Sequence, residues 1–102
     1  MNGDVGPHQG AEGVPAPAAH VVTATFVGET VLYDSINCRP ILLNVSAAAV
    51  WALLDGRRTL MEIVAAVAEG FGAAPALVEA DVAATVARFH HLGLLATADH
   101  EE

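Results

Sequence analysis

After residue 20 the chain alternates hydrophobic and polar positions in a way that is typical of strands. Two runs rich in β-branched and aromatic residues, Val21 to Val27 and Thr30 to Asp34, flank Gly28-Glu29. This pattern predicts a β-hairpin, because β-branched residues favour strands and glycine favours tight turns. The apolar run Ile41 to Leu43 predicts a third strand, with Pro40 at its entrance, where a missing N–H does least harm.

Beyond Asn44 the apolar period lengthens toward 3.6 residues, which predicts helices. Ser46 is expected to cap the start of the first helix. Thr59 and Glu62 have the spacing of a capping box at the start of the second helix. Pro75 suits the first turn of the third, and Gly93 suits its end. The helices are expected over residues 46 to about 54, 59 to about 71, and 75 to about 92.

The order of three strands followed by three helices predicts a small α+β domain of the winged helix-turn-helix type over residues 20–96. A chain of 102 residues has room for one such domain. Residues 1–19 are rich in glycine and proline and contain almost nothing large and apolar, so they are expected to form a disordered arm. Residues 97–102 are expected to form an acidic tail.

The net charge of the chain indicates which classes of partner are not expected. Four arginines face twelve acidic residues, which gives a formal net charge of −8. This balance is opposite to the one that neutralises phosphates, so nucleic acid and anionic membranes are not expected as partners. The sequence also contains neither a signal peptide pattern nor an apolar run long enough to cross a bilayer. Together with the single cysteine, Cys38, these features predict a cytoplasmic protein.

Few polar residues have a spacing that suggests catalysis or metal binding. His90 and His91 are adjacent, so on a helix they point about 100° apart and do not form a pair of metal ligands. Cys38 has no obvious activating base near it in sequence and is interpreted as a bystander thiol. We therefore expect no enzyme activity, no cofactor and no metal. Trp51 lies among apolar residues at helical spacing and is expected in the core rather than at an interface.

Winged helices often bind DNA, so a DNA-binding transcriptional regulator is the alternative function. The last predicted helix carries one arginine, Arg88, and we expect Glu79 and Asp81 near its first turn, where recognition helices usually approach bases. This charge pattern disfavours the alternative.

Recognition of another polypeptide fits the pattern better. A sheet of three strands leaves edge N–H and C=O groups unpaired, and an extended peptide can complete such an edge as an added strand. The third predicted strand is short and is followed by helices, which favours a groove between this strand and a helix. The competing interpretation is that the N-terminal arm covers this edge.

Several short segments together resemble the PqqD-like family, the recognition elements used in the biosynthesis of ribosomally made, post-translationally modified peptides. The resemblance runs from about Val21 to Leu95. The Asp-Gly-x-Arg-Thr turn between the Leu-Asn strand end and the Asp-Val to Gly-Leu-Leu helix is its most specific part. The segments are Leu43-Asn44, Ala49-Val50-Trp51, Asp55-Gly56-Arg57-Arg58-Thr59, Glu62-Ile63, and Asp81-Val82 through Phe89 to Gly93-Leu94-Leu95.

The resemblance implies a non-catalytic domain that binds the leader region of a precursor peptide as an added strand. The leader would pair with the third strand, lie against the third helix, and be presented to a modifying enzyme such as a radical-SAM maturase or a lasso-type leader protease. Thr85 stands where a larger apolar residue is common in the family, and Leu92 where a polar or basic one is common. Whether the domain forms a homodimer stays open. The implied contact residues are Pro40, Ile41, Leu42, Leu43, Asp81, Thr85, Arg88 and Leu92.

Overall fold

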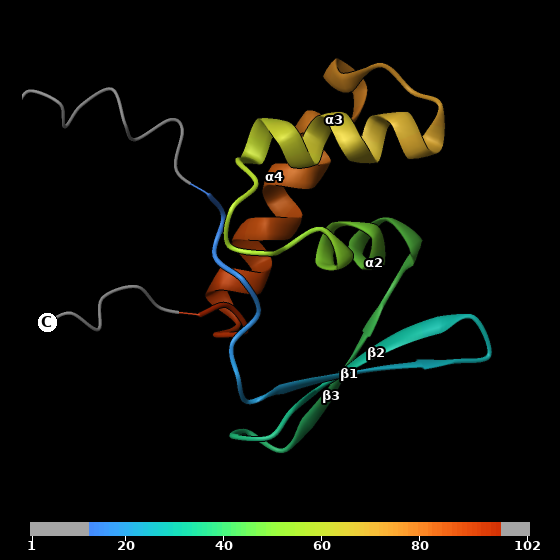
Figure 1. Cartoon of the computed structure of the whole chain (residues 1–102). Coiled ribbons are helices and arrows are strands. Elements are labelled where there is room, and N and C mark those ends of the chain that lie inside the picture. Colours follow the sequence, from blue (N-terminus) through green and yellow to red (C-terminus); the bar gives the residue numbers. More distant parts are fainter. Residues whose placement is uncertain (1–12, 97–102) are drawn as a thin grey trace, which may run out of the picture.

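Residues 13–96 are described by a computed structural model of the chain, in which three strands precede three helices (Figure 1). The strands form one antiparallel sheet in the order β1-β2-β3, and the helices lie together on one side of it. This arrangement confirms the expected small α+β domain. The elements are β1 (Val21–Phe26), β2 (Glu29–Asp34), β3 (Arg39–Leu43), α2 (Val45–Ala52), α3 (Leu60–Phe71) and α4 (Pro75–His91).

The turn of the first hairpin lies one residue earlier than expected. Phe26 pairs with Glu29, and the two loop residues Val27 and Gly28 have φ values of 51° and 80°. A two-residue hairpin loop of type I′ needs positive φ at both positions, because its twist then matches that of the strands. The strand pairing therefore holds Val27 in a conformation that β-branched residues seldom adopt, and β2 begins at Glu29.

One of the two predicted side-chain caps is present in the structure, and the other is replaced by a neighbouring residue. Thr59 and Glu62 form the expected capping box at the start of α3. The cap of α2 is Asn44 instead of Ser46, since the Asn44 side chain accepts a hydrogen bond from the Ala47 amide at 2.8 Å. Asparagine is as good an N-cap as serine, and it stands at the end of β3, where the backbone is still extended.

Helix α4 begins at Pro75 and ends before Gly93, as expected. Gly93 has a φ of 76°, which suits the residue that follows the C-cap. Glu79 and Asp81, expected near the first turn, lie in the second, and the first turn contains no acidic residue. A helix that begins at Pro75 completes its first turn at Val78, so the expected position of both acidic residues was wrong by about one turn.

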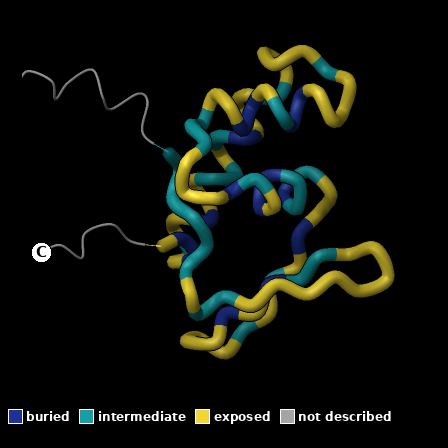
Figure 2. Tube along the Cα trace, viewed as in Figure 1, coloured by how far each residue is buried: buried dark blue, intermediate teal, exposed yellow. Residues whose placement is uncertain are grey.

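Most residues of the core lie on the three helices, and Leu32 of β2 and Leu43 of β3 join them from the sheet (Figure 2). Trp51 of α2 is buried against Phe89 of α4 in an edge-to-face contact, with ring centroids 5.1 Å apart. Its indole N–H donates a hydrogen bond to the hydroxyl of Thr23 on β1, at 3.0 Å. This confirms Trp51 as a core residue that joins two helices to the sheet.

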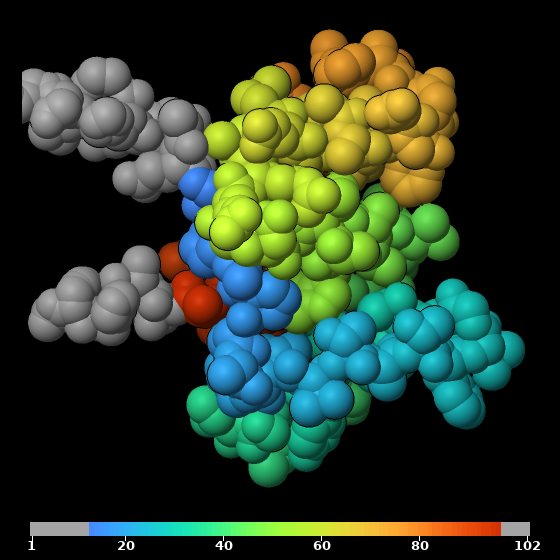
Figure 3. Space-filling model, viewed as in Figure 1, coloured from blue at the N-terminus to red at the C-terminus, as the bar shows by residue number. Residues whose placement is uncertain are grey.

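The segment before β1 is hydrogen-bonded to the domain. The amide of Val14 donates to the Arg58 carbonyl, that of Ala18 to the Leu94 carbonyl, and that of Ala96 to the Ala16 carbonyl. Figure 3 shows this segment beside the C-terminal end of the described chain.

The sequence places residues 13–19 in a disordered arm, and the structure gives them these contacts instead. Main-chain hydrogen bonds depend little on side chains, so composition does not reveal them. The other expected arm residues, 1–12, and the expected tail, 97–102, lie outside the described residues.

A substitution at Gly13 tests whether this segment is docked in solution. A Cβ atom at Gly13 would lie 2.6 Å from the Gly56 carbonyl oxygen, whereas a Cβ at Gly70 in α3 meets nothing within 4 Å. Gly13→Ala is expected to lower the free energy of unfolding by roughly 1–3 kcal/mol through overpacking. Gly70→Ala is the control and should raise it by about 0.5–1 kcal/mol. Urea denaturation measures both, and an unchanged Gly13→Ala protein would show that the segment is not docked.

Candidate functional site

The first feature of the candidate site is the direction of the backbone groups in β2. Successive residues of a strand point their N–H and C=O groups to opposite sides. The amide of Ser35, directly after β2, donates to the His20 carbonyl, directly before β1, at 3.1 Å. By alternation, Glu29, Val31 and Tyr33 also bond toward β1. The remaining β2 residues therefore direct their backbone groups toward β3; these are Thr30, Leu32 and Asp34.

The same alternation identifies the open edge of β3. The three β2 residues that face β3 are paired with Leu43, Ile41 and Arg39, respectively. The backbone groups of Pro40 and Leu42 consequently point away from the sheet. Because proline has no N–H, this edge offers the N–H and C=O of Leu42 together with the C=O of Pro40. Proline is usually found at such an outward position of an edge strand.

Within residues 13–96, β2 is the one strand that pairs with β3. The segment before β1 bonds to Arg58, Leu94 and Ala96, which are not part of β3. As far as residues 13–19 are concerned, this argues against the interpretation that the arm covers the edge. Among residues 13–96, none pairs with the outer edge of β3.

Helix α4 forms the second side of the candidate site. At the start of β3, the Arg39 Nη2 atom donates a hydrogen bond to the Leu92 carbonyl at the end of α4, at 2.9 Å. Beyond the end of β3, Ser46 of α2 lines the same cavity as Asp81 and Thr85 of α4. The Arg39 hydrogen bond therefore joins the start of β3 to the end of α4, and α2, which follows β3, packs beside α4 at the cavity. The cavity itself is formed by α2, α3 and α4, and no residue of β3 lines it.

The cavity at the second end is small and mostly apolar. Its volume is about 70 Å³, and it is partly open to solvent. An engineered apolar cavity of about 150 Å³ admits benzene. This cavity has about half of that volume, so a small aliphatic side chain fits it better than an aromatic ring does. The lining residues are Ser46 and Val50 of α2, Val67 and Phe71 of α3, and Val78, Asp81, Val82 and Thr85 of α4.

The residues implied by the family resemblance have different positions on β3 and α4. Pro40 and Leu42 are exposed on the outer side of β3, whereas Ile41 and Leu43 turn their side chains toward the core. On α4, Asp81 and Thr85 line the cavity, Arg88 is exposed, and Leu92 is half-buried beside the Arg39 contact.

Sequence reasoning missed Arg39 and Phe71. Arg39 stands next to Pro40, but its bond to Leu92 joins residues 53 positions apart. Phe71 has helical spacing typical of a core residue, yet 47% of it is exposed at the mouth of the cavity. Neighbouring residues in the sequence do not reveal either role, because each role depends on the position of α4 in the folded domain.

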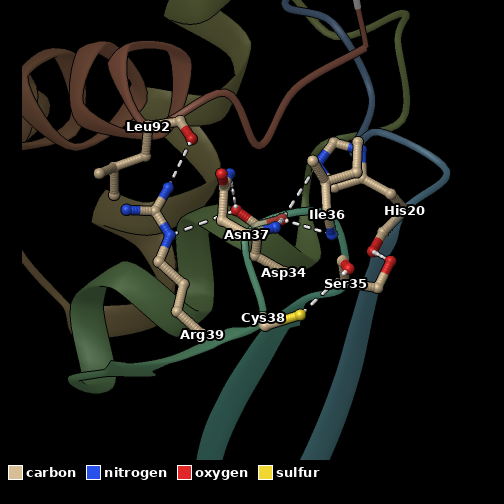
Figure 4. Close-up of polar contacts among 8 residues, drawn as sticks. All are labelled: His20, Asp34, Ser35, Ile36, Asn37, Cys38, Arg39 and Leu92. Carbon is tan, nitrogen blue, oxygen red and sulfur yellow. Dashed lines mark hydrogen bonds and ion pairs between the residues drawn. The ribbon is translucent and has the colours of Figure 1, made fainter.

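A buried carboxylate holds Arg39 at the start of β3. Asp34 ends β2, is fully buried, and accepts hydrogen bonds from the turn that leads into β3 (Figure 4). The Asn37 side-chain amide donates at 2.9 Å, and the amides of Ile36 and Asn37 donate at 3.1 Å. The Arg39 Nε atom donates at 3.2 Å, while its Nη2 atom reaches Leu92. Asp34 thus orients the arginine that connects β3 to α4.

These donors also control the ionisation of Asp34. The Asn37 side-chain amide, followed by the Asn37 amide N–H, the Arg39 guanidinium and the Ile36 amide N–H, lowers the pKa of Asp34 to about 2. Burial acts in the opposite direction, because it disfavours the charged form. The His20 Nε2 atom lies 3.5 Å from the same carboxylate. Asp34 is therefore ionised at neutral pH.

The other chemically reactive candidates are not brought together. Cys38 is exposed, with a φ of 55°, and its thiol lies 3.8 Å from the Ser35 carbonyl oxygen. His90 and His91 are both exposed at the end of α4. In the described part of the chain, no three His, Cys, Asp or Glu side chains are grouped so as to hold a metal ion. None of the helices between residues 13 and 96 combines the length and apolar character needed to cross a bilayer.

Acid titration tests the role of Asp34. The native state lowers the pKa of Asp34 from 3.8 to about 2, so the stabilisation it provides is complete well above pH 4 and is lost as the pH falls toward 2. Asp34→Asn should therefore unfold at lower urea concentration than the unmodified protein at pH 7, with a difference that shrinks below about pH 4. Asp55→Asn, in an exposed turn, should show a smaller effect of the same sign. A destabilisation of Asp34→Asn that is independent of pH would contradict this role.

The chain is similar to one solved structure and matches one protein-family model. Its fold is similar to that of a solved structure described as TbiB1 in complex with the TbiA(beta) leader peptide, with a TM-score of 0.71 and 23% sequence identity. The similarity covers 81% of this chain and 96% of that one. No curated protein sequence matches the chain significantly. Residues 29–95 match the family model described as coenzyme PQQ synthesis protein D (PqqD), and the chain is therefore a member of the PqqD family.

Proposed function

We propose that this domain binds the leader region of a ribosomally synthesised precursor peptide by strand addition and presents it to a modifying enzyme. Membership of the PqqD family supports this function, and so does the similar fold of TbiB1, which was solved with a leader peptide. The observation that carries the proposal is the open edge of β3 at Leu42, and we propose that the leader lies in a groove between this edge and α4. An extended peptide can satisfy those main-chain groups while its side chains contact the helix.

The proposed contacts are of two kinds. Main-chain pairing involves Leu42 and the carbonyl of Pro40, while Ile41 and Leu43 hold β3 in register with β2. Side-chain contacts come from α4, where Asp81 and Thr85 line the cavity, Arg88 is exposed, and Leu92 lies at the other end. Main-chain bonds would supply affinity, and the cavity would select one small aliphatic side chain of the leader.

The domain itself is proposed to perform no covalent chemistry and to need no cofactor. Its buried carboxylate, Asp34, is fully engaged in holding the β2–β3 turn. The catalytic partner would be a separate modifying enzyme in the cytoplasm, such as a radical-SAM maturase or a lasso-type leader protease. Arg88 is the one arginine of α4, and the net charge of the chain is −8, so no observation favours the alternative function of binding DNA.

Blocking the outward N–H of Leu42 tests the function directly. Leu42→Pro removes this donor but none of the hydrogen bonds that join β3 to β2, so the fold should persist. We expect binding of a synthetic leader peptide from the cognate precursor, measured by calorimetry, to weaken at least about tenfold. Leu42→Ala keeps the donor and should lose about threefold or less.

Circular dichroism first verifies that both variants are folded. Equal loss of binding in Leu42→Pro and Leu42→Ala would exclude strand addition at β3. Mass spectrometry of the recovered leader should show no change in mass, and a modified or cleaved leader would contradict a non-catalytic role. Binding of duplex DNA instead of the leader at low salt would favour the regulator.

Filling the cavity tests the side-chain contact. Thr85→Phe places a ring where the leader side chain is proposed to lie, so binding should weaken by about tenfold or more. Ala84→Phe, one position earlier on α4 and exposed, is the matched control and should bind normally. If both variants bind the leader as the unmodified protein does, the cavity takes no part in recognition.

A further inference from the structure

The sheet has a second open edge, along β1, that the proposed function does not use. By the alternation described above, Val22, Ala24 and Phe26 bond toward β2, and Thr23 and Thr25 point their backbone groups outward. The outward N–H of Val21 is already bonded to the Ala18 carbonyl, at 3.1 Å. Thr23 and Thr25 therefore offer two N–H donors and two C=O acceptors. Within the described residues no strand pairs with this side of β1.

This edge also lacks the features that usually prevent edge pairing. Natural edge strands are protected by charged residues, proline, bulges or short length. Strand β1 has six residues, VVTATF, of which none is charged and none is proline, and five are exposed. The hairpin of β1 and β2 projects beyond the helices (Figure 1). By contrast, Pro40 removes one donor from the edge of β3.

The outer face of β1 is apolar as well as open. Val22 is 57% exposed and Phe26 is 72% exposed, and both lie on the face of the sheet that points away from the helices. Ala24 lies between them on the same face. The sequence of this face is therefore symmetric in character, with a large apolar residue on either side of a small one.

We propose that β1 pairs in antiparallel orientation with β1 of a second copy of this chain, about a two-fold axis at Ala24. In this register Thr23 and Thr25 of one subunit form four hydrogen bonds with Thr25 and Thr23 of the partner subunit. Val22 lies opposite Phe26 of the partner subunit, which is a favourable apolar pair, and Ala24 meets Ala24 of the partner subunit. A two-fold axis at Thr23 would require a hydrogen bond from the N–H of Val21, which is already bonded to the Ala18 carbonyl. A two-fold axis at Thr25 would require Val27 to pair as a strand residue, although it lies in the hairpin loop.

The resulting dimer contains a six-stranded sheet with a β3 strand at each outer edge. Both leader grooves stay open, so dimer formation does not depend on the proposed function. The interface consists of one short strand pair, and stable protein interfaces usually bury about 1,200–2,000 Å². The dimer is therefore expected to be weak and to form at high protein concentration.

Cysteine cross-linking tests the register. Ala24 does not bond toward the partner, and in such antiparallel pairs the Cα atoms lie about 4.5 Å apart, within the range that a disulfide spans. In a Cys38→Ser background, Ala24→Cys should form a disulfide-linked dimer under mild oxidation. Val22→Cys is exposed on the same face but would be opposite Phe26 of the partner subunit, so it should cross-link at least about tenfold more slowly. Equal rates for the two variants would mean random collision and would overturn the proposal.

Sedimentation velocity over a concentration series supplies the second test. Thr25→Pro removes an outward N–H and leaves the bonds between β1 and β2, so it should stay monomeric where the unmodified protein dimerises. Leu42→Pro, on the other edge, should dimerise normally, and Thr25→Pro should bind leader normally. A monomer at all concentrations, or a dimer that Leu42→Pro abolishes and Thr25→Pro does not, would refute pairing through β1. Loss of leader binding in Thr25→Pro alone would instead mean that β1 takes the leader, which contradicts both proposals.

Discussion

The arrangement of the candidate groove depends on one buried carboxylate. Asp34 has no contact with solvent, and an ionised group in that position is stable only when its hydrogen bonds are satisfied. Its four donors come from the turn after β2 and from Arg39 at the start of β3. Because the same arginine also bonds to the Leu92 carbonyl, the carboxylate sets both the path of β3 and its distance from the end of α4. This link acts together with Trp51, which joins α2 and α4 to β1, and with Leu43, which packs in the core.

The relative position of β3 and α4 matters because strand addition and side-chain selection need different surfaces. Leu42 presents main-chain groups that would accept many extended peptides, and it carries little sequence information. The cavity formed where α2, α3 and α4 meet can discriminate by size, since it holds about 70 Å³. In the proposed function, the two surfaces together would form a site that is tolerant along most of a peptide and selective at one position. The same physics explains why β1, which has an unprotected edge but no adjacent helix groove, is better suited to an identical strand.

Much of this fold could be predicted from local sequence, and the site could be predicted less well. The capping box at Thr59, Pro75 at the start of α4 and Gly93 at its end are short-range signals, and each appears in the structure as expected. The prediction of Ser46 as the helix cap was wrong. Asn44 and Ser46 both suit an N-cap, and the helix begins directly after Asn44 because β3 ends there. The sequence does not show that residues 13–19 are hydrogen-bonded to the domain, because main-chain hydrogen bonds do not depend on amino-acid composition. The roles of Arg39 and Phe71 depend on contacts distant in sequence, which periodicity does not reveal.

Amide hydrogen exchange measured by NMR, with and without a saturating leader peptide, tests the central claim most directly. Ile41 and Leu43 bond toward β2 in the free protein, so their amides should exchange slowly in both states. The Leu42 amide faces outward and should exchange rapidly in the free protein, then at least about tenfold more slowly when the leader is bound. An unchanged Leu42 amide in the presence of bound leader would show that the peptide does not pair with β3.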